Sequence, residues 1–205
     1  MSKISLTGNP SGSGVLTIAA PDTSTDRTLT LPDASGTLLS NVSDITTAQL
    51  PAGSVLQVVS TTKTDTFTTT STSFVEITGL TASITPTSST SKILILVSVT
   101  GSQSVGTNDA FIGLFRDSTQ IDLGDASGSR VSHSFLLNSS NSGWTVNGFT
   151  NFLDAPSTTS AITYAVRARV PTTATLFINR SQNDPDSVTG SGRSVSAITL
   201  MEIAA

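Results

Sequence analysis

The stretch AITYAVRARV, residues 161–170, decides the fold class because two sets of side chains, one of them apolar, alternate along it residue by residue. Tyr164 and Val166 belong to the apolar set, and Arg167 and Arg169 belong to the opposite set. Strict alternation predicts a β-strand with one buried face and one solvent-facing side. The two arginines would therefore point outward from the same face of a sheet.

Comparable runs follow one another from Ser54 onward, separated by residues that favour turns. The run Ile93–Val97 is almost continuously apolar, which is typical of a central strand buried on both faces. We expect strands at Val55–Thr61, Thr64–Thr70, Phe74–Ile77, Ala82–Thr85, Lys92–Thr100, Ala110–Arg116, Gln120–Leu123, Ser132–Asn138, Trp144–Leu153, Ala161–Val170, Thr175–Arg180 and Val195–Ile203.

Composition supports an all-β protein. The 205 residues include 34 serines and 35 threonines but only two glutamates and three lysines, so residues that favour helices are scarce. Threonine and valine suit a pleated, half-buried surface. Some ten strands in roughly 150 residues predict a β-sandwich over residues 54–205, with a jelly-roll topology.

Residues 1–53 form a different kind of segment, extended and with short strands. The apolar residues are few in each short run, and this area is too small to stabilise an independent monomer. The segment is therefore expected to dock on another protein or to wind with copies of itself. A short helix at Asp44–Leu50 is expected before the boundary at Pro51–Gly53. The residues predicted to carry anchoring and oligomerisation are Leu16, Ile18, Leu29, Leu31 and Leu38.

Charge and hydropathy exclude several classes of function. The net charge is −4 and the isoelectric point is about 4.7, which argues against a nucleic-acid-binding protein. No apolar run approaches the length of a membrane-spanning helix. The first residues run directly into polar sequence, without the apolar region of a secretory signal. Cysteine is absent, so neither disulfides nor thiolate metal sites are expected.

Catalytic and metal-binding chemistry has only weak candidates. His133 has serine neighbours at 132 and 134, but adjacent strand residues point to opposite faces, so a general base there is disfavoured. The two glutamates, Glu76 and Glu202, are not marked as a glycosidase pair. We predict no enzyme, no cofactor and no metal site. Some acidic residues are of the type that binds calcium, but their spacing matches no EF-hand loop, and we interpret them as turn residues: Asp117, Asp122, Asp125, Asp184 and Asp186.

Binding features are more suggestive. Two interpretations are open for Arg167 and Arg169, with Lys92 and Arg180 elsewhere. They form a small basic patch that binds a negatively charged glycan, or they are outward charges that discourage pairing of sheet edges. The second interpretation is favoured. Trp144 follows a flexible stretch and offers either an exposed ring for stacking on a sugar or a packing residue. We expect surface contacts in the loops 101–109, 124–131, 139–143 and 183–193.

A family resemblance is carried by the segment TLTLPDASGTLL, residues 28–39, which resembles a segment that recurs in bacteriophage tail-fibre and related virion proteins. Further pieces resemble β-rich fibre-like proteins of tailed phages, particularly of marine or cyanobacterial hosts: Gly53–Val59, Phe74–Leu80, Ser91–Ile95, Ile178–Ser181 and Ile198–Ile203. The resemblance implies a homotrimer whose N-terminal segment attaches to the particle while the C-terminal β domain faces outward. It implies no catalytic residue.

The sequence therefore predicts a structural protein of a phage virion, a trimeric tail fibre or fibre tip that attaches to the host surface. Its expected partners are copies of itself, tail or capsid proteins and a host surface glycan, and it would be assembled in the host cytoplasm and exposed on the particle. Two alternatives remain open. One is a capsid decoration, cement or head-fibre protein, and the other is a polysaccharide-degrading enzyme.

Overall fold

Antiparallel β-sheets account for all the regular strands in the computed structural model, which describes residues 11–15, 22, 24–26, 28, 49–104, 109–139, 141–171, 174–186 and 192–205. The chain divides into two compact units, Met1–Ser43 and Asp44–Ala205, and the strands belong to the second. Outside the described residues lie nearly all of the helix expected at Asp44–Leu50 and all five predicted anchoring residues, namely Leu16, Ile18, Leu29, Leu31 and Leu38.

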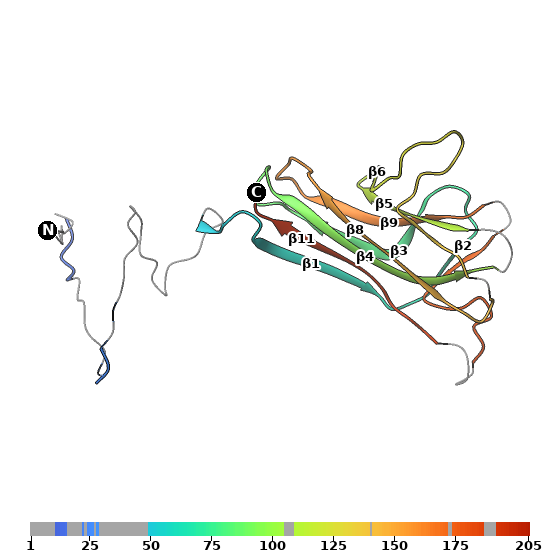
Figure 1. Ribbon diagram of the computed structural model, residues 1–205, viewed down its shortest axis with the longest axis horizontal. Helices are drawn as coiled ribbons and strands as arrows, with labels where there is room; N and C mark the ends of the chain where they lie inside the picture. Colours follow the sequence, from blue (N-terminus) through green and yellow to red (C-terminus); the bar gives the residue numbers. More distant parts are fainter. Residues whose placement is uncertain are drawn as a thin grey trace. The chain divides into compact units, whose positions relative to one another are not determined.

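The first sheet, sheet A, is organised around its longest strand (Figure 1). Strand β4 pairs on one side with β11 and then with β10, and on the other side with β8. Strand β1 extends the sheet beyond β11, and β2 extends it beyond β10. The bounds are β1 Val55–Lys63, β2 Phe67–Thr69, β4 Lys92–Gln103, β8 Val146–Asp154, β10 Leu176–Ile178 and β11 Ser196–Ile203.

The second sheet, sheet B, has the order β3-β9-β5, and β5 pairs further with both β6 and β7. All of these pairings are antiparallel as well. Apolar side chains from both sheets form one buried core, so the two sheets have a sandwich-like arrangement. The bounds are β3 Val75–Ile84, β5 Ala110–Arg116, β6 Thr119–Ile121, β7 Phe135–Leu137 and β9 Ile162–Arg169.

The core follows the alternation that the sequence predicts. In β9 the apolar set is buried, and the arginines of the opposite set are only partly covered. Removing such side chains from water is the main stabilising contribution, at roughly 25 cal/mol for each Å² of apolar surface. The largest fully buried side chains are Tyr164, Ile77, Leu80, Ile93, Ile95, Ile112, Leu114, Leu137, Leu176, Ile178, Ile198 and Leu200.

Two strand predictions are corrected by one feature of β3. The sequence suggested separate strands at Phe74–Ile77 and Ala82–Thr85, on either side of Gly79. A single strand instead runs from Val75 to Ile84, with its register against β9 shifted between Glu76 and Thr81. Gly79 has φ of +82°, a conformation that glycine adopts without steric cost, so the glycine permits a bulge and does not end the strand.

The prediction that β4 is buried on both faces is wrong. The strand is central, between β11 and β8, but only one of its faces enters the core. Ile93, Ile95 and Val97 are buried, while Leu94 is half-buried and Leu96 is 39% exposed. The reason is that sheet A has no covering layer on its outer side among the described residues, so apolar side chains of the continuous run remain at the surface.

The domain has two distinct ends, which can be followed along β4 in Figure 1. At the end we call the root end, Gly53 N donates to Ala204 O at 2.8 Å, and Ala204 N donates to Ser54 O at 2.9 Å. Lys92, the first residue of β4, lies opposite Ile203 at this end. Strand β4 then spans about 40 Å at ~3.3 Å per residue before it reaches the opposite, loop end.

Candidate interaction surfaces

Two of the loops expected to make surface contacts, 139–143 and 183–193, meet at the loop end, and the loop expected from residue 101 begins later because β4 runs to Gln103. Asn183 donates two hydrogen bonds to Ser142, from N to the carbonyl oxygen at 3.1 Å and from Nδ2 to Oγ at 2.8 Å. Gln103 exchanges a pair of bonds with Ser139, which donates from N to Oε1 at 2.7 Å and accepts at its carbonyl oxygen from Nε2 at 3.1 Å. The described parts of loops 139–143 and 183–193 are therefore joined at the surface, and the buried end of β4 holds the first of them from below.

Trp144 lies at this loop end and is 63% exposed. Its backbone is fixed, because its N donates to Asn141 O at 3.1 Å and its carbonyl oxygen accepts from Ser139 Oγ at 3.2 Å. An indole ring held on a fixed backbone and open to solvent is able to stack on a flat apolar surface such as a sugar ring. The residue therefore has the exposure that a glycan contact requires.

Three of the five acidic residues considered as calcium ligands are engaged in other ways. Asp184 pairs with Arg193 at 2.7 Å and with Arg180 at 3.5 Å. Asp117 Oδ1 accepts from Thr163 N at 3.1 Å, and Asp122 Oδ2 accepts from Thr150 Oγ1 at 2.6 Å. Within the described part of the chain, no group of three acidic or histidine side chains is arranged to hold a metal ion.

The outer face of sheet A is apolar and hydroxyl-bearing. Val58, Met201, Leu94 and Leu153 occupy successive cross-strand positions from β1 to β8, so they form one apolar row across the sheet. The next rows contain Ser60, Thr199, Leu96 and Asn151, followed by Thr62, Ala197, Ser98 and Phe149. Lys92, at the root end, is the only charged side chain that these strands carry on this face.

A hollow of about 280 Å³ lies in the middle of this outer face. The depression forms because two small residues, Ser98 and Ala197, are cross-strand partners at its floor. Phe149 is the cross-strand partner of Ser98, lines the hollow and is 73% exposed. A large exposed ring thus stands beside a depression of the same face.

The outer face of sheet B carries arginine side chains stacked on aromatic rings. Arg167 Cζ lies 4.4 Å from the centre of the Phe115 ring, and Arg169 Cζ lies 6.0 Å from that of Phe111. The His133 ring lies 4.9 Å from the Phe111 ring, centre to centre, and its Nδ1 lies 2.9 Å from Val131 O. We call the set Phe111, Phe115, His133, Arg167 and Arg169 the arginine ladder.

The serines beside His133 form hydrogen bonds with residues other than His133. Ser134 Oγ donates to Asp122 O at 3.1 Å and accepts from Leu114 N at 3.1 Å. The carbonyl oxygen of Ser132 accepts from Gln120 Nε2 at 3.1 Å. His133 therefore acts in the structure as an aromatic neighbour of Phe111.

A buried polar cluster connects the two sheets at Asp154, the last residue of β8. Tyr164 OH donates to Asp154 Oδ2 at 2.6 Å, and Arg116 Nη1 lies 3.0 Å from Oδ1 and 2.9 Å from Oδ2. Burial, together with the bond to Asp154, raises the pKa of the Tyr164 hydroxyl far above its usual range. A deprotonated phenol in this position would face a carboxylate, so the cluster requires the neutral form.

Glu202 is fully buried near the root end and has no cationic partner among the described residues. Its Oε1 accepts from Thr87 N and Thr87 Oγ1, both at 2.7 Å, and its Oε2 accepts from Gln57 Nε2 at 2.6 Å. Burial alone would raise its pKa, but the bonds from Gln57 and Thr87, with the nearby Ser91 hydroxyl acting in the same direction, hold the pKa below its ordinary value. This carboxylate fastens the loop after β3, and it is not free to meet a substrate.

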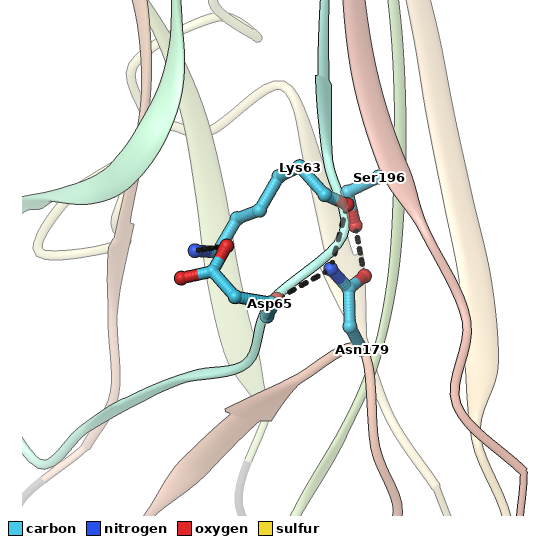
Figure 2. Close-up of polar contacts among 4 residues, drawn as sticks. All are labelled: Lys63, Asp65, Asn179 and Ser196. Carbon is cyan, nitrogen blue, oxygen red and sulfur yellow. Dashed lines mark hydrogen bonds and ion pairs between the residues drawn. The ribbon is translucent and has the colours of Figure 1, made fainter.

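A third cluster fixes the turn between β1 and β2 (Figure 2). Asn179 Nδ2 donates to Lys63 O and Asp65 O, both at 2.9 Å, while its Oδ1 accepts from Ser196 Oγ at 2.7 Å. Lys63 is buried, and its Nζ turns away from Asn179 to meet Asp65 Oδ1 at 2.7 Å. That hydrogen bond lowers the pKa of Asp65. Alternation in the sequence gave no sign of this cluster, since it joins β1, β10 and β11.

Among the described residues, no helix is long and apolar enough to cross a membrane. No protein-family model matches the chain, and no curated protein matches it.

Proposed function

We propose that the chain is a structural component of a phage virion, a trimeric tail fibre or fibre tip that attaches to the host surface. The observation that carries this proposal is the separation of the two ends of the β domain. The chain enters beside Ala204 at the root end, and the loops with the exposed Trp144 lie at the opposite end of β4. This arrangement suits a domain that is tethered at one end and makes contacts at the other.

The strand order supports a jelly roll as the architecture of this domain. When the eight principal strands are numbered along the chain, the order β1-β11-β4-β8 becomes 1-8-3-6, and the order β3-β9-β5-β7 becomes 2-7-4-5. Two interlocked Greek keys give these orders. Jelly rolls occur in capsid and lectin domains, so the architecture is compatible with the proposal without identifying a function.

The trimer contact is proposed to be the outer face of sheet A. Its strands carry almost no charge on this side, so copies of the face meet without repulsion. Phe149 and the hollow beside it supply a knob and a hole on the same face. In a ring of copies related by rotation, the Phe149 of one chain would fill the hollow of the next and close the assembly.

Host recognition is proposed to lie at the loop end, with Trp144 stacking on a surface glycan. A single contact of this kind is weak, but three chains in one fibre raise the effective concentration of the second and third contacts. Replacing Trp144 with alanine would remove the ring without disturbing the bonds of its backbone. Weaker adsorption to host cells, with an unchanged unfolding temperature, would support this role.

Localisation in purified particles tests the proposed function directly. An antibody against residues 54–205 should label the tail tip in gold-labelled electron micrographs, and preimmune serum is the control. Labelling distributed over the head would replace the proposal with a capsid decoration protein. Absence of the chain from washed particles would overturn both, and release of reducing sugar from a polysaccharide would then point to an enzyme.

A further inference from the structure

The arginine ladder contains hydrogen-bond donors that the protein does not use. Arg169 makes no hydrogen bond or ion pair with any described residue, and Arg167 makes one, from Nη2 to Asp117 O at 3.0 Å. The Nε atoms of both arginines are shielded from solvent and have no acceptor. A buried donor without an acceptor is destabilising, so these guanidinium groups are held at a cost to the fold.

The rings of the ladder hold the guanidinium groups in place. Phe111 and Phe115 lie two strand positions to either side of Gly113, which is the cross-strand partner of Arg167. A Cβ at Gly113 would come within 2.8 Å of Gln120 Nε2, 3.1 Å of the Phe74 ring and 3.2 Å of the Phe115 ring, so the glycine lets these side chains pack closely beneath Arg167. Stacking on an aromatic face leaves the edge of a guanidinium, with its N–H groups, available for a planar acceptor.

Nearby acidic groups do not neutralise the ladder. Glu76 is the cross-strand partner of Arg167, but its exposed carboxylate forms no ion pair with it. The carboxylate of Asp117 accepts from Thr163 N, so it is directed to the backbone of β9. Two positive charges two residues apart therefore remain without a paired acid, in a chain whose net charge is −4.

We propose that the arginine ladder on the outer face of sheet B binds an acidic polysaccharide through the carboxylates of its sugars. A carboxylate is planar and matches the forked donors of arginine, and the half-buried Phe111 and His133 rings offer a flat surface to the apolar side of a sugar. The negative net charge of the chain opposes binding of densely charged polymers such as nucleic acid. The inference rests on the proposed function, because it names the class of host glycan that the particle would meet.

The test is calorimetric titration of the full-length chain with a hyaluronan hexasaccharide, which carries a carboxylate on every second sugar, at one fixed ionic strength. A neutral chitin hexasaccharide should give no binding. Replacing Arg169 with glutamine should weaken the affinity for hyaluronan about tenfold or more. Arg169→Lys, which keeps the charge but loses the planar fork, should give an intermediate loss.

Arg130→Gln is the matched control, since it removes the same charge from an exposed loop arginine that bonds only within its own loop. It should change the affinity less than twofold. Glu76→Gln should strengthen binding, because it removes the acid that stands opposite Arg167. Equal losses in the Arg169→Gln and Arg130→Gln variants would overturn the proposal, and so would binding of the neutral sugar.

A heparin hexasaccharide and a thymidine hexanucleotide distinguish the chemical sources of negative charge. Tighter binding of heparin would assign the site to sulfated sugars, and equal binding of the oligonucleotide would reduce it to attraction of any polyanion and overturn the proposal. The proposed function fails separately. A chain that labels the tail but ignores hyaluronan disproves this inference alone, whereas a chain that binds hyaluronan but is absent from particles disproves the virion role alone.

Discussion

The hydroxyl of Tyr164 donates a 2.6 Å hydrogen bond to Asp154 Oδ2, and this single bond joins the centre of sheet B to the edge strand of sheet A. Arg116 holds the same carboxylate from β5. A buried carboxylate that lost either donor would remain in the core with an unmet acceptor. The pair therefore connects the ionisation of a side chain to the packing of the two sheets.

The ionisation of Tyr164 should destabilise the fold at alkaline pH. Its pKa in the folded state is raised above the unfolded value of about 10, so its contribution is complete below pH ~10 and is lost as the pH rises beyond it. Because Tyr164 is the only tyrosine, the ultraviolet absorbance of tyrosinate reports this residue alone. We expect no tyrosinate signal from the folded chain near pH 10.

The chain in denaturant is the control for that titration, and it should ionise near the ordinary value. The Tyr164→Phe variant should lose about 1.5–3 kcal/mol of stability at neutral pH, and its free energy of unfolding should no longer depend on this ionisation. A normal tyrosine titration in the folded protein would show that the hydroxyl is not held by Asp154.

Glu202 should give the opposite dependence at acidic pH. Its folded-state pKa lies below its unfolded value, so its contribution is complete above the unfolded value and is lost as the pH falls through the folded one. Replacing Glu202 with glutamine should cost about 1–3 kcal/mol near neutral pH and should flatten the acid limb of a urea-unfolding series. Glu76→Gln, at an exposed position, is the matched control and should preserve that limb.

Asn179→Asp should be among the most damaging isosteric changes. The amide Nδ2 donates to two backbone carbonyl oxygens, and an aspartate oxygen in its place would face those carbonyls without a proton. We expect a loss of about 2–4 kcal/mol in chemical denaturation, from unmet buried acceptors and repulsion. Asn183→Asp alters an exposed amide and should change stability by less than about 0.5 kcal/mol. Similar losses in both variants would contradict the structural role of Asn179.

The outer face of sheet A should control the oligomeric state. Full-length chain is expected to sediment with three times the 21.0 kDa mass of one chain, and Phe149→Asp should reduce it to monomers by placing a charge beside the hollow. Leu123→Asp is the control, because Leu123 is an exposed apolar residue outside this face. A monomeric wild-type chain would exclude the trimer, and a trimer that survives Phe149→Asp would move the contact to the segment 1–53, where oligomerisation is also predicted.

Alternation in the sequence was sufficient to locate most strands, because each face of a half-buried strand presents one kind of side chain at every second residue, about 6.6 Å apart. The strand predicted at Ala161–Val170 is observed as Ile162–Arg169 with the expected face buried. The pattern was misleading in β3, because a glycine is equally compatible with a turn and with a bulge. The pairing around that residue decides between them, and it is not local in sequence.

The surfaces and polar clusters were less accessible to sequence reasoning. A strand pattern gives the side on which Tyr164 lies but not that Asp154 lies opposite it, since the partners belong to different sheets. The arginine pair was correctly placed on one outward face, whereas the rings beneath it come from β5 and from the loop before β7. The five residues predicted for anchoring lie beyond the described part of the chain, so their role stays a prediction.

The neighbouring positions of Gly53 and Ala204 have a mechanical consequence. A force applied at Gly53 reaches the domain at the start of β1, which is paired with β11 from Val55 to Lys63. A ladder loaded along its length must break many hydrogen bonds together, whereas one pulled from its end opens them singly. A pull between Gly53 and the loop end would therefore load the β1–β11 ladder in shear.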